Sequence, residues 1–226
     1  MWALFAPDRR MRLNLGIRRR LAPLVDNGRA ELELLNIMLL SFPGSPVIYY
    51  GDEIGMGDDI WLRDRNGVRT PMQWSSYRNA GFSYAGASGL YAPVISDSIY
   101  GYQRVNVEEQ RMNPTSLLNW MKRTLAVRAK HKAFGRGEFQ WIEVENTRLL
   151  AFVRRYRDET ILCVMNLGAS PQTGQLMLQQ FNGFVLRDLF SGGWFGEVGL
   201  NPFAVTLAPR GYFWLQLVDP MAPAAS

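Results

Sequence analysis

The sequence predicts an α/β segment followed by an all-β antiparallel sandwich. In the first part, a helical apolar pattern at 29–42 is followed by the short apolar run 46–50, which lies between two glycines. A helix, a turn and a strand buried on both faces are typical of a parallel sheet. After about His131, short β-like segments alternate with turn residues, which is the pattern of an antiparallel sandwich.

The composition is that of a globular chain with a core. Hydrophobic residues make up 47% of the 226 residues and charged residues 20%, a balance that excludes a mainly disordered chain. The formal net charge is +5, and arginines near the start, such as Arg18, Arg19 and Arg20, contribute much of it. Because basic surface is more often solvated or paired with acids than bound to nucleic acid, we expect no nucleic-acid partner.

Cysteine and histidine usage excludes two kinds of chemistry. The one cysteine, Cys163, lies in an apolar run and cannot form an internal disulfide, so we expect a buried, inert thiol. The one histidine, His131, excludes a zinc site with several histidine ligands and disfavours a Ser-His-Asp triad. We therefore expect a surface histidine and no metal site.

Membrane and secretory segments are not expected. No uninterrupted apolar run approaches the roughly 20 residues of a membrane-spanning helix. Basic residues follow the apolar stretch 1–7, which is the reverse of a secretory signal peptide. The sequence therefore predicts a cytoplasmic protein with no membrane partner.

Helical spacing predicts two long helices in the first part. Asp26 and Asn27 are suitable caps for the first, at 29–42. Asn113 and Pro114 are typical of the start of the second, which should end near Phe134. The stripes expected to be buried are Leu32, Leu35, Leu39 and Phe42 in the first helix and Leu117, Leu118, Met121 and Leu125 in the second.

The stretch at about 51–110 has no sustained periodicity and is rich in Gly, Asp, Arg, Tyr and Trp. A loop of that length within a compact domain is usually functional. The β-like segments that follow the second helix lie at 138–144, 148–156, 159–167, 175–178, 184–189, 204–207 and 212–218. We therefore predict two domains, 1–131 and 132–218, and a flexible Pro- and Ala-rich tail at 219–226.

Four carboxylates, Asp52, Glu53, Asp58 and Asp59, follow the predicted strand directly. Two interpretations stay open: they line a substrate or metal rim at the carboxyl end of a barrel strand, or they cap turns and pair with arginines. The spacing around Asp64 does not fit a calcium EF-hand, and the glycines at 55–57 do not complete a dinucleotide motif.

The loop at 63–74 concentrates arginine and aspartate beside Trp74. A guanidinium can hold a carboxylate and donate to sugar hydroxyls, and an indole face can pack against a pyranose. The alternative is a salt-bridged loop with Trp74 buried as part of the core. In the sandwich, aromatics such as Trp141 and Trp214 could form a sugar platform, but alternating aromatics in strands more often belong to the core.

The segments 43–58, 64–74 and 79–83 together closely resemble the trehalose synthases of the α-amylase superfamily, which is glycoside hydrolase family 13. The stretches 16–24 and 116–128 support this resemblance, which covers nearly the whole chain. It implies that the first part is the C-terminal portion of a (β/α)₈ barrel, comprising the last strand, its helices and the active-site loop. Small departures from the family pattern occur at Arg63 and at Ser76 and Tyr77.

The resemblance also implies what the chain does. Such enzymes interconvert maltose and trehalose by intramolecular glucosyl transfer with retention, and their catalytic carboxylates come from earlier barrel strands. We therefore expect a truncated enzyme that begins at an internal Met1, has no catalytic residue of its own and is inactive alone. In the intact enzyme the partners are maltose, trehalose and glucose, and a maltokinase is a possible fused or associated partner.

Residue roles follow from the same resemblance. Arg69 matches an arginine near the subsite of the nonreducing glucose, and Arg65 is a second candidate for substrate binding. Asp52 and Glu53 match a motif whose acids are expected to support the loop. No cofactor is expected in this chain, and a structural calcium, if bound, would lie in the preceding part of the barrel.

Two other functions stay open at this point. The chain could belong to an α-glucosidase that hydrolyses its substrate, or the sandwich could be a noncatalytic sugar-binding module. One strand cannot close a barrel, so the apolar face at 46–50 should be exposed in the isolated chain. We therefore expect the whole chain to aggregate and the sandwich alone to fold.

Overall fold

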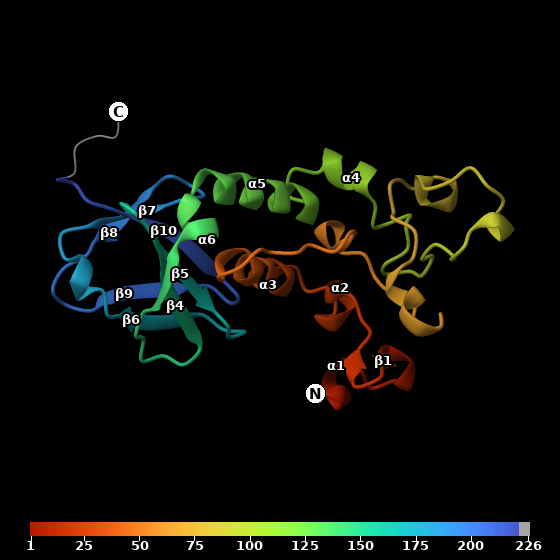
Figure 1. Cartoon of the computed structure of the whole chain (residues 1–226), viewed down its shortest axis with the longest axis horizontal. Coiled ribbons are helices and arrows are strands. Elements are labelled where there is room, and N and C mark those ends of the chain that lie inside the picture. The colour runs from red at the N-terminus through yellow and green to blue at the C-terminus, as the bar shows by residue number, and fades with distance from the viewer. Residues whose placement is uncertain (222–226) are drawn as a thin grey trace. The chain divides into compact units, whose positions relative to one another are not determined.

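The computed structural model describes residues 1–221, and the chain divides into two compact units (Figure 1). The first unit contains Met1–Leu32 and Val47–Arg123, and the second contains Glu33–Pro46 and the chain from Thr124 onward. The last five residues of the predicted tail at 219–226 lie outside the described residues. The helices are α1 (Trp2–Phe5), α2 (Leu21–Leu24), α3 (Arg29–Ser41), α4 (Val107–Met112), α5 (Leu117–Lys130) and α6 (Lys132–Arg136).

The first unit has little regular secondary structure. Strands β1 (Arg12–Leu13) and β2 (Gly16–Ile17) form a short antiparallel hairpin, and the chain between α3 and α4 runs as loops and single turns of 3-10 helix. A small core joins that loop to the helices after it, because Ile54, Met56 and Met72 pack with Val107 and Leu118. The long aperiodic loop predicted at 51–110 is therefore largely confirmed, with α4 forming only at its end.

The predicted strand at 46–50 is not present. The segment has no regular secondary structure, and the side chains of Val47, Tyr49 and Tyr50 are 80%, 41% and 38% exposed. A parallel strand exists only where neighbouring strands satisfy its backbone groups, and residues 1–221 offer this segment none. The apolar run was identified correctly, but its burial requires partners that these residues do not contain.

Helix α3 buries only part of the predicted row of side chains. Leu32, Leu34, Ile37 and Leu40 are buried, whereas Leu35 and Leu39 of the predicted stripe are 36% and 40% exposed. Apolar residues surround this helix on nearly all sides, so the sequence pattern does not identify the face that packs.

The start of the second predicted helix also differs. Asn113 forms a turn by accepting from the backbone N–H of Thr115 at 3.0 Å, and helix α5 begins at Leu117 behind the Ser116 hydroxyl, which accepts from Asn119 N–H. Helix α5 ends at Lys130, and His131 separates it from the short α6. Helix α6 contains Gly135, which was predicted to end the longer helix.

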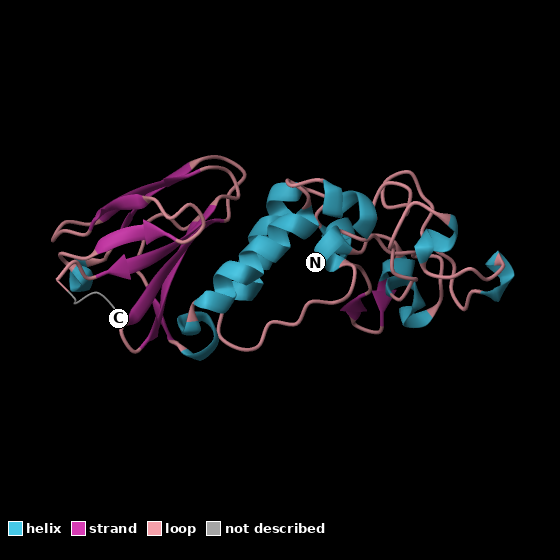
Figure 2. Cartoon of the chain, turned by 90° about the horizontal axis from the view of Figure 1, so that it is seen from above, coloured by secondary structure: helices cyan, strands magenta, loops and turns pink. Residues whose placement is uncertain are grey.

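The second unit contains the predicted antiparallel sandwich (Figure 2). A six-stranded sheet has the order β3-β4-β5-β10-β7-β8 and faces a two-stranded sheet, β6-β9, across a shared apolar core. The strands are β3 (Glu138–Trp141), β4 (Leu149–Tyr156), β5 (Glu159–Asn166), β6 (Gln172–Leu176), β7 (Val185–Asp188), β8 (Trp194–Glu197), β9 (Phe203–Leu207) and β10 (Tyr212–Val218). Strand β8 was not predicted, because Gly192, Gly193 and Gly196 interrupt the apolar pattern there.

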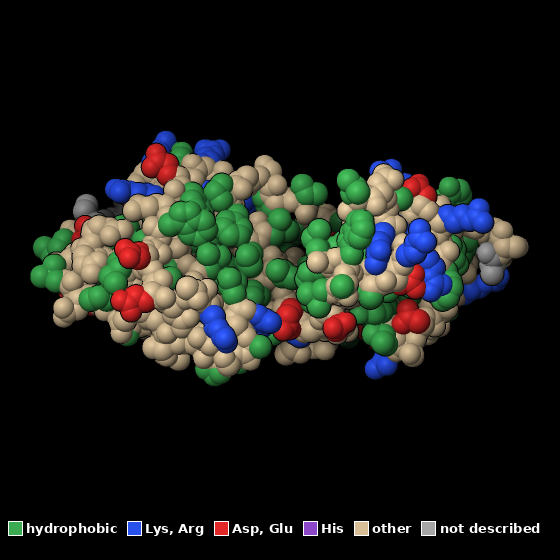
Figure 3. Space-filling view, turned by 90° about the horizontal axis from the view of Figure 1, so that it is seen from below, with side chains coloured by type: hydrophobic (Ala, Val, Ile, Leu, Met, Phe, Trp, Pro, Cys, Tyr) green, Lys and Arg blue, Asp and Glu red, His purple; other side chains and the backbone are tan. Residues whose placement is uncertain are grey.

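The other face of the large sheet packs on the end of α3, within the same unit. Trp214 is fully buried and its indole N–H donates to the Ser41 hydroxyl at 2.8 Å, while the Phe42 and Phe152 rings stack with centroids 5.2 Å apart. Phe152 and Trp214 are therefore core residues, as expected of alternating aromatics, whereas Trp141 is 58% exposed. Exposed apolar side chains are also evident in the space-filling view (Figure 3).

Candidate sugar-binding cavity

The loop after Tyr50 builds a cavity of about 440 Å³ within the first unit. That volume is in the range of small-molecule sites, which are typically apolar with a few polar groups. Its lining combines one carboxylate and one guanidinium with several aromatic rings. The lining residues are Tyr50, Glu53, Arg69, Thr70, Pro71, Met72, Trp74, Phe82, Leu90, Tyr91 and Ala92.

Arg20 fixes the start of this loop through hydrogen bonds to Tyr50 and Asp52. Its Nη1 donates to the Tyr50 carbonyl at 2.7 Å and to Asp52 Oδ1 at 3.2 Å, and its guanidinium lies 4.9 Å and 4.8 Å from the ring centroids of Tyr49 and Tyr50. The Arg20 side chain is almost fully buried. This arginine therefore fixes the backbone from which the cavity residues Tyr50 and Glu53 project.

Asp52 is paired with Arg20, and its side chain does not line the cavity. Burial raises the pKa of Asp52, and the neighbouring Arg20 opposes that rise only in part. The chain turns sharply around it, with Gly51 and Gly55 at φ values of +87° and +73° that favour glycine. A loop-supporting role for Asp52 stays a prediction, and this geometry is the arrangement that such a role requires.

Two further arginines hold the loop beyond Asp52. The buried Arg18 guanidinium donates to the carbonyls of Ile60, Leu62 and Asp64, so one side chain holds the stretch 60–64. Arg19 donates through Nε to Asp58 Oδ2 at 2.9 Å. Pairing of the loop acids with arginines was one of the two interpretations left open from the sequence, and the structure identifies Arg19 and Arg20 as the partners of Asp58 and Asp52.

The cavity contains Arg69 and Glu53 but not Arg65. Both Arg69 and Glu53 line it, so the predicted substrate-binding arginine and one of the predicted loop acids share one site. Arg65 lines a separate hollow of about 310 Å³, which also contains Arg18, Arg19 and Val68. Within the described residues, Arg65 and Arg69 therefore line different cavities. The substrate-binding role of Arg65 stays a prediction.

Aromatic residues make up much of the remaining wall. The Tyr50 hydroxyl donates to the Thr70 carbonyl at 2.8 Å, and the buried Thr70 hydroxyl makes no hydrogen bond with residues 1–221. Trp74, proposed above as a sugar contact or a core residue, is 47% exposed at the cavity and is not part of the core. Phe82 and Tyr91 line the same cavity, and sequence analysis assigned them no role.

The segment that bears Trp74 is tied to its surroundings on both sides. Gln73 is fully buried and its amide donates to the carbonyls of Tyr100 and Val105. The carbonyls of Gln73 and Trp74 accept from Val107 N–H and Glu108 N–H at 3.0 Å and 2.9 Å. These bonds fix the cavity wall to the first turn of α4.

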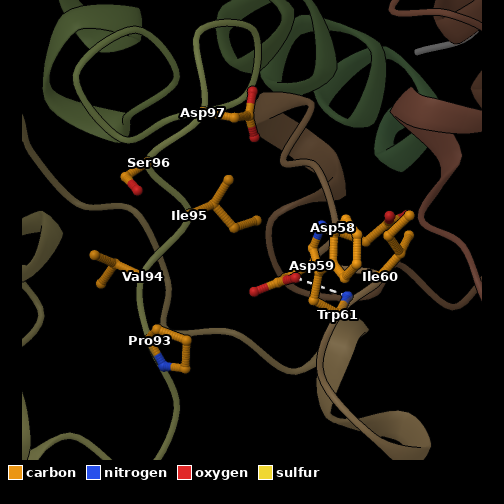
Figure 4. Close-up of a pocket in the computed structure, with 9 residues that line it drawn as sticks. All are labelled: Asp58, Asp59, Ile60, Trp61, Pro93, Val94, Ile95, Ser96 and Asp97. Atoms are coloured by element: carbon orange, nitrogen blue, oxygen red, sulfur yellow. Dashed lines mark hydrogen bonds between the residues drawn. The ribbon is translucent and has the colours of Figure 1, made fainter. Parts of the chain in front are cut away.

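A second hollow of about 320 Å³ contains the other acids of the loop (Figure 4). It lies between residues 58–61 and 93–97, and Asp59 points into it while accepting from Trp61 N–H at 2.9 Å. Asp58 is paired with Arg19, and Asp97 accepts from Ile99 N–H and Tyr100 N–H, both at 2.7 Å. Each carboxylate here has a backbone or arginine partner, so the turn-capping interpretation fits them.

The possible metal ligands, the cysteine and the histidine build no further site within residues 1–221. Within residues 1–221, no group of three or more His, Cys, Asp and Glu side chains could hold a metal ion. Cys163 is fully buried, and burial raises the pKa of its thiol. His131 was expected at the surface, but it is partly buried, with Nδ1 2.7 Å from Glu159 Oε1. In the same range no helix is long and apolar enough to cross a membrane.

Comparison with known proteins places both parts of the chain. Residues 18–137 match the family model for the α-amylase catalytic domain, and residues 139–214 match the C-terminal domain of maltogenic amylase. The trehalose synthase of Pimelobacter is 50% identical over 224 residues, which cover 97% of this chain and 39% of that protein. The trehalose synthase/amylase of Mycobacterium tuberculosis is 52% identical, over 96% of this chain and 37% of that protein.

More distant proteins give weaker matches. A probable α-glucosidase of Rhizobium meliloti is 29% identical over 69% of this chain. The crystal structure of trehalose-6-phosphate hydrolase from Bacillus licheniformis superposes with a TM-score of 0.69 at 22% identity, over 92% of this chain and 42% of that one, which shows a shared fold. The chain thus spans under two fifths of the two trehalose synthases compared above. It belongs to the α-amylase family, and its sequence corresponds to the C-terminal portion of the trehalose synthases.

Proposed function

We propose that this chain forms the C-terminal part of an enzyme that interconverts maltose and trehalose, and that its cavity is one wall of the glucose site. The observation that carries the proposal is the placement of Arg69, Glu53 and exposed aromatic rings around one cavity, in a chain about 50% identical to trehalose synthases. Charged groups that donate to or accept from hydroxyls, beside flat apolar rings, are what recognition of a pyranose requires.

The reaction places definite demands on this wall. A retaining glycosyl transfer uses two carboxyl groups about 5–5.5 Å apart, one as nucleophile at the anomeric carbon and one as proton donor to the leaving oxygen. Among the residues that line the cavity in the described chain, Glu53 is the one carboxylate. We infer that this chain binds and orients the sugar, while the reacting carboxylates belong to the rest of the enzyme.

Arg69 has a distinct role in this proposal. An arginine at the glucose site donates up to five hydrogen bonds in a fixed plane, so it can hold a carboxylate and still donate to sugar hydroxyls. Arg69 follows a turn of 3-10 helix, Asp64–Val68, and its own N–H donates to the Asn66 carbonyl at 2.9 Å. That turn directs the arginine toward the cavity it shares with Glu53, and we propose that it binds the nonreducing glucose.

Transfer is favoured over hydrolysis as the reaction of the intact enzyme. Identity to the trehalose synthases is about 50%, against 29% to the α-glucosidase. The sandwich gives little separate support for a sugar-binding module, because Trp214 is fully buried and Trp141, which is 58% exposed, is the exposed one of the two aromatics considered for it.

A chimera tests the proposal. These 226 residues would replace the matching C-terminal portion of the Pimelobacter trehalose synthase, and products from maltose would be separated by anion-exchange chromatography. We expect trehalose from the chimera, and none from this chain alone or from the shortened Pimelobacter enzyme. Trehalose made by this chain unaided, or glucose without trehalose from the chimera, would contradict the proposal.

Two further expectations belong to the same proposal. A cytoplasmic location is supported by cysteine usage, because one buried thiol provides no disulfide for an oxidising compartment. Fractionation of cells that express the chimera would test it, and recovery outside the cytoplasm would contradict it.

A maltokinase partner stays a prediction, and co-purification with a maltose-phosphorylating activity is its test.

A further inference from the structure

We propose that the buried guanidinium of Arg20 binds a carboxylate from the part of the barrel that precedes this chain, and so joins the loop after Tyr50 to that part of the enzyme. This inference rests on the proposed function and goes beyond it. Arg20 directly precedes α2 and lies outside the lining of the sugar-binding cavity. It is therefore a positioning residue, which acts through the loop that it holds.

The hydrogen bonds of Arg20 are the first observation. Its side chain is 1% exposed, and Nη1 makes the two bonds to Tyr50 and Asp52 described above. Nε and Nη2 are buried as well, but neither makes a hydrogen bond with residues 1–221. These two nitrogens lie along one edge of the planar guanidinium, where their parallel N–H groups match the two oxygens of a carboxylate.

The other buried arginines show how the same chain satisfies a guanidinium. All three nitrogens of Arg18 donate to backbone carbonyls, those of Arg10 and of the stretch 60–64. Arg154 in the second unit has an unbonded Nε, but both of its terminal nitrogens donate. Within residues 1–221, Arg20 is therefore the buried arginine that has a whole edge without an acceptor.

The acids of the loop are committed to other partners. Asp52 is bonded to Nη1 of Arg20. Asp58 Oδ2 accepts from Arg19 Nε at 2.9 Å and from the Arg20 backbone N–H at 2.8 Å, and Glu53 lines the cavity. Because a buried charged donor without an acceptor costs free energy, the edge of Arg20 requires an acceptor from another part of the enzyme.

The surroundings of Arg20 indicate where that acceptor comes from. The rings of Tyr49 and Tyr50 lie over the guanidinium, and these residues are 41% and 38% exposed. Aromatic faces attract a cation but are weak acceptors for N–H groups. The two tyrosines end the segment 47–50, which has no strand partner in residues 1–221. Because barrel strands are parallel, a strand that pairs with this segment brings its carboxyl end beside Arg20.

A bond at this edge has a consequence for the proposed reaction. Arg20 fixes the Tyr50 carbonyl, and the side chains of Tyr50 and Glu53 line the cavity. A carboxylate that joins Arg20 to the preceding part of the barrel therefore sets the position of the cavity wall relative to the reacting carboxylates proposed above. A displacement of about 1 Å between such groups lowers a rate by up to roughly 100-fold.

A zero-length cross-link identifies the partner of Arg20. The chimera described above, carrying Arg20→Lys, would be treated with a carbodiimide, which joins an amine to a carboxylate in contact with it, and then digested for mass spectrometry. We expect an amide between residue 20 and an Asp or Glu of the Pimelobacter portion. Arg19→Lys is the matched control, because Arg19 pairs with Asp58 and the introduced amine should link residues 19 and 58.

The result for residue 20 decides the proposal. A link from residue 20 to Asp52 alone, or no link from residue 20, would overturn it, and the same result is expected if a backbone carbonyl fills the edge. This measurement does not depend on activity. It therefore decides the role of Arg20 even if the chimera makes no trehalose and the proposed function fails.

Trehalose formation by the chimera tests the positioning role. Arg20→Met should lower the rate from maltose by about tenfold, and Arg20→Lys should restore little of it, because lysine keeps the charge but lacks the paired N–H groups. Circular dichroism would check folding. Arg9→Met is the control, since Arg9 is exposed in the same unit, and it should leave the rate unchanged. Full activity in Arg20→Lys, or an equal loss in the control, would overturn the positioning role and leave the proposed function intact.

Discussion

Arginine side chains that are buried or partly buried donate to backbone carbonyls in both units of this chain. In the second unit, Arg128 Nε donates to the Leu40 carbonyl at 2.9 Å and Arg154 Nη1 donates to the Ser41 carbonyl at 2.7 Å. Both carbonyls lie at the C-terminal end of α3, where the helix dipole favours a cation. Arg154 is 2% exposed, and its Nη2 also donates to the Gly137 carbonyl at 2.9 Å.

Replacement of Arg154 tests this use of charge. Arg154→Met should lower the free energy of unfolding of the second unit by about 2–3 kcal/mol, because two buried carbonyls lose a charged donor. Arg155→Met is the matched control, since Arg155 is the next residue on β4 and is exposed, and it should change stability by less than about 0.5 kcal/mol. Urea denaturation followed by near-UV circular dichroism would measure both, and equal effects would contradict this account of Arg154.

Asp52 gives a prediction about pH. Burial raises its pKa in the folded chain, so the folded state binds the proton more tightly than the unfolded state does. The contribution of Asp52 to stability is therefore greatest when it is protonated, and it falls as pH rises from the unfolded pKa through the folded one. Asp52→Asn should thus stabilise the first unit at pH 7 relative to the unaltered chain, and this difference should vanish near pH 3. Urea denaturation at both values is the measurement, and a variant less stable at pH 7 than at pH 3, relative to the unaltered chain, would contradict the sign.

Elements were predictable where local pattern and tertiary packing agree. Strands β4, β5 and β10 alternate or run apolar between turn residues, and the sequence predicts each within a residue or two of its observed bounds. The segment 46–50 has an equally strong apolar pattern, but a strand is a property of a pair, and no partner lies among the described residues. The packed face of α3 was missed for a related reason, because apolar residues on both sides leave the choice to tertiary contacts.

The strained turn at 78–81 gives a prediction at the scale of an element. Gly81 has φ +65°, and a Cβ there would lie 2.4 Å from the Ser75 hydroxyl oxygen. Gly81→Ala should therefore cost about 1–2 kcal/mol in the first unit and displace Phe82. Gly86→Ala is the control, because its Cβ would meet only ordinary contact at 3.8 Å. Proteolysis within 75–85 would report the opening of the turn, and equal cleavage of both variants would contradict the prediction.

The candidate site was only partly predictable. Trp74 could be identified because arginine, aspartate and tryptophan crowd one short segment, whereas Arg69 was identified only through the family resemblance. Phe82 and Tyr91 could not, because they reach the cavity through loop turns that have no periodicity. Pairing of the loop acids with arginines was one of two open interpretations, but the sequence did not identify Arg20 as the partner of Asp52, because the two lie 32 residues apart.

At the scale of the whole molecule, apolar surface remains open in both units. Val47, Tyr49 and Tyr50 are exposed in a segment whose backbone has no strand partner in residues 1–221. Such a segment can pair with a second chain. The sandwich also depends on more than its own strands, because Trp214 and Phe152 contact Ser41 and Phe42. The segment 137–218 alone lacks Ser41 and Phe42, so we expect it to be less stable than the same segment within the whole chain.

Self-association in solution tests whether the exposed segment 46–50 pairs with a second chain. The unaltered chain should form larger species as its concentration rises, and Val47→Lys should reduce this, because a charge at an unpaired strand edge opposes pairing. Met112→Lys adds the same charge at a similarly exposed apolar position at the end of α4 and serves as the control. Sedimentation velocity would measure both, and a monodisperse unaltered chain would contradict this prediction.

The most direct test of the proposed intramolecular transfer is the fate of free glucose. The chimera described above would convert unlabelled maltose in the presence of excess ¹³C-labelled D-glucose, and the trehalose would be analysed by mass spectrometry. If the glucose released from maltose stays in the site, the trehalose formed early in the reaction is almost entirely unlabelled. Trehalose in which one ring carries the label from the start would show that the released glucose escapes, and would contradict the account.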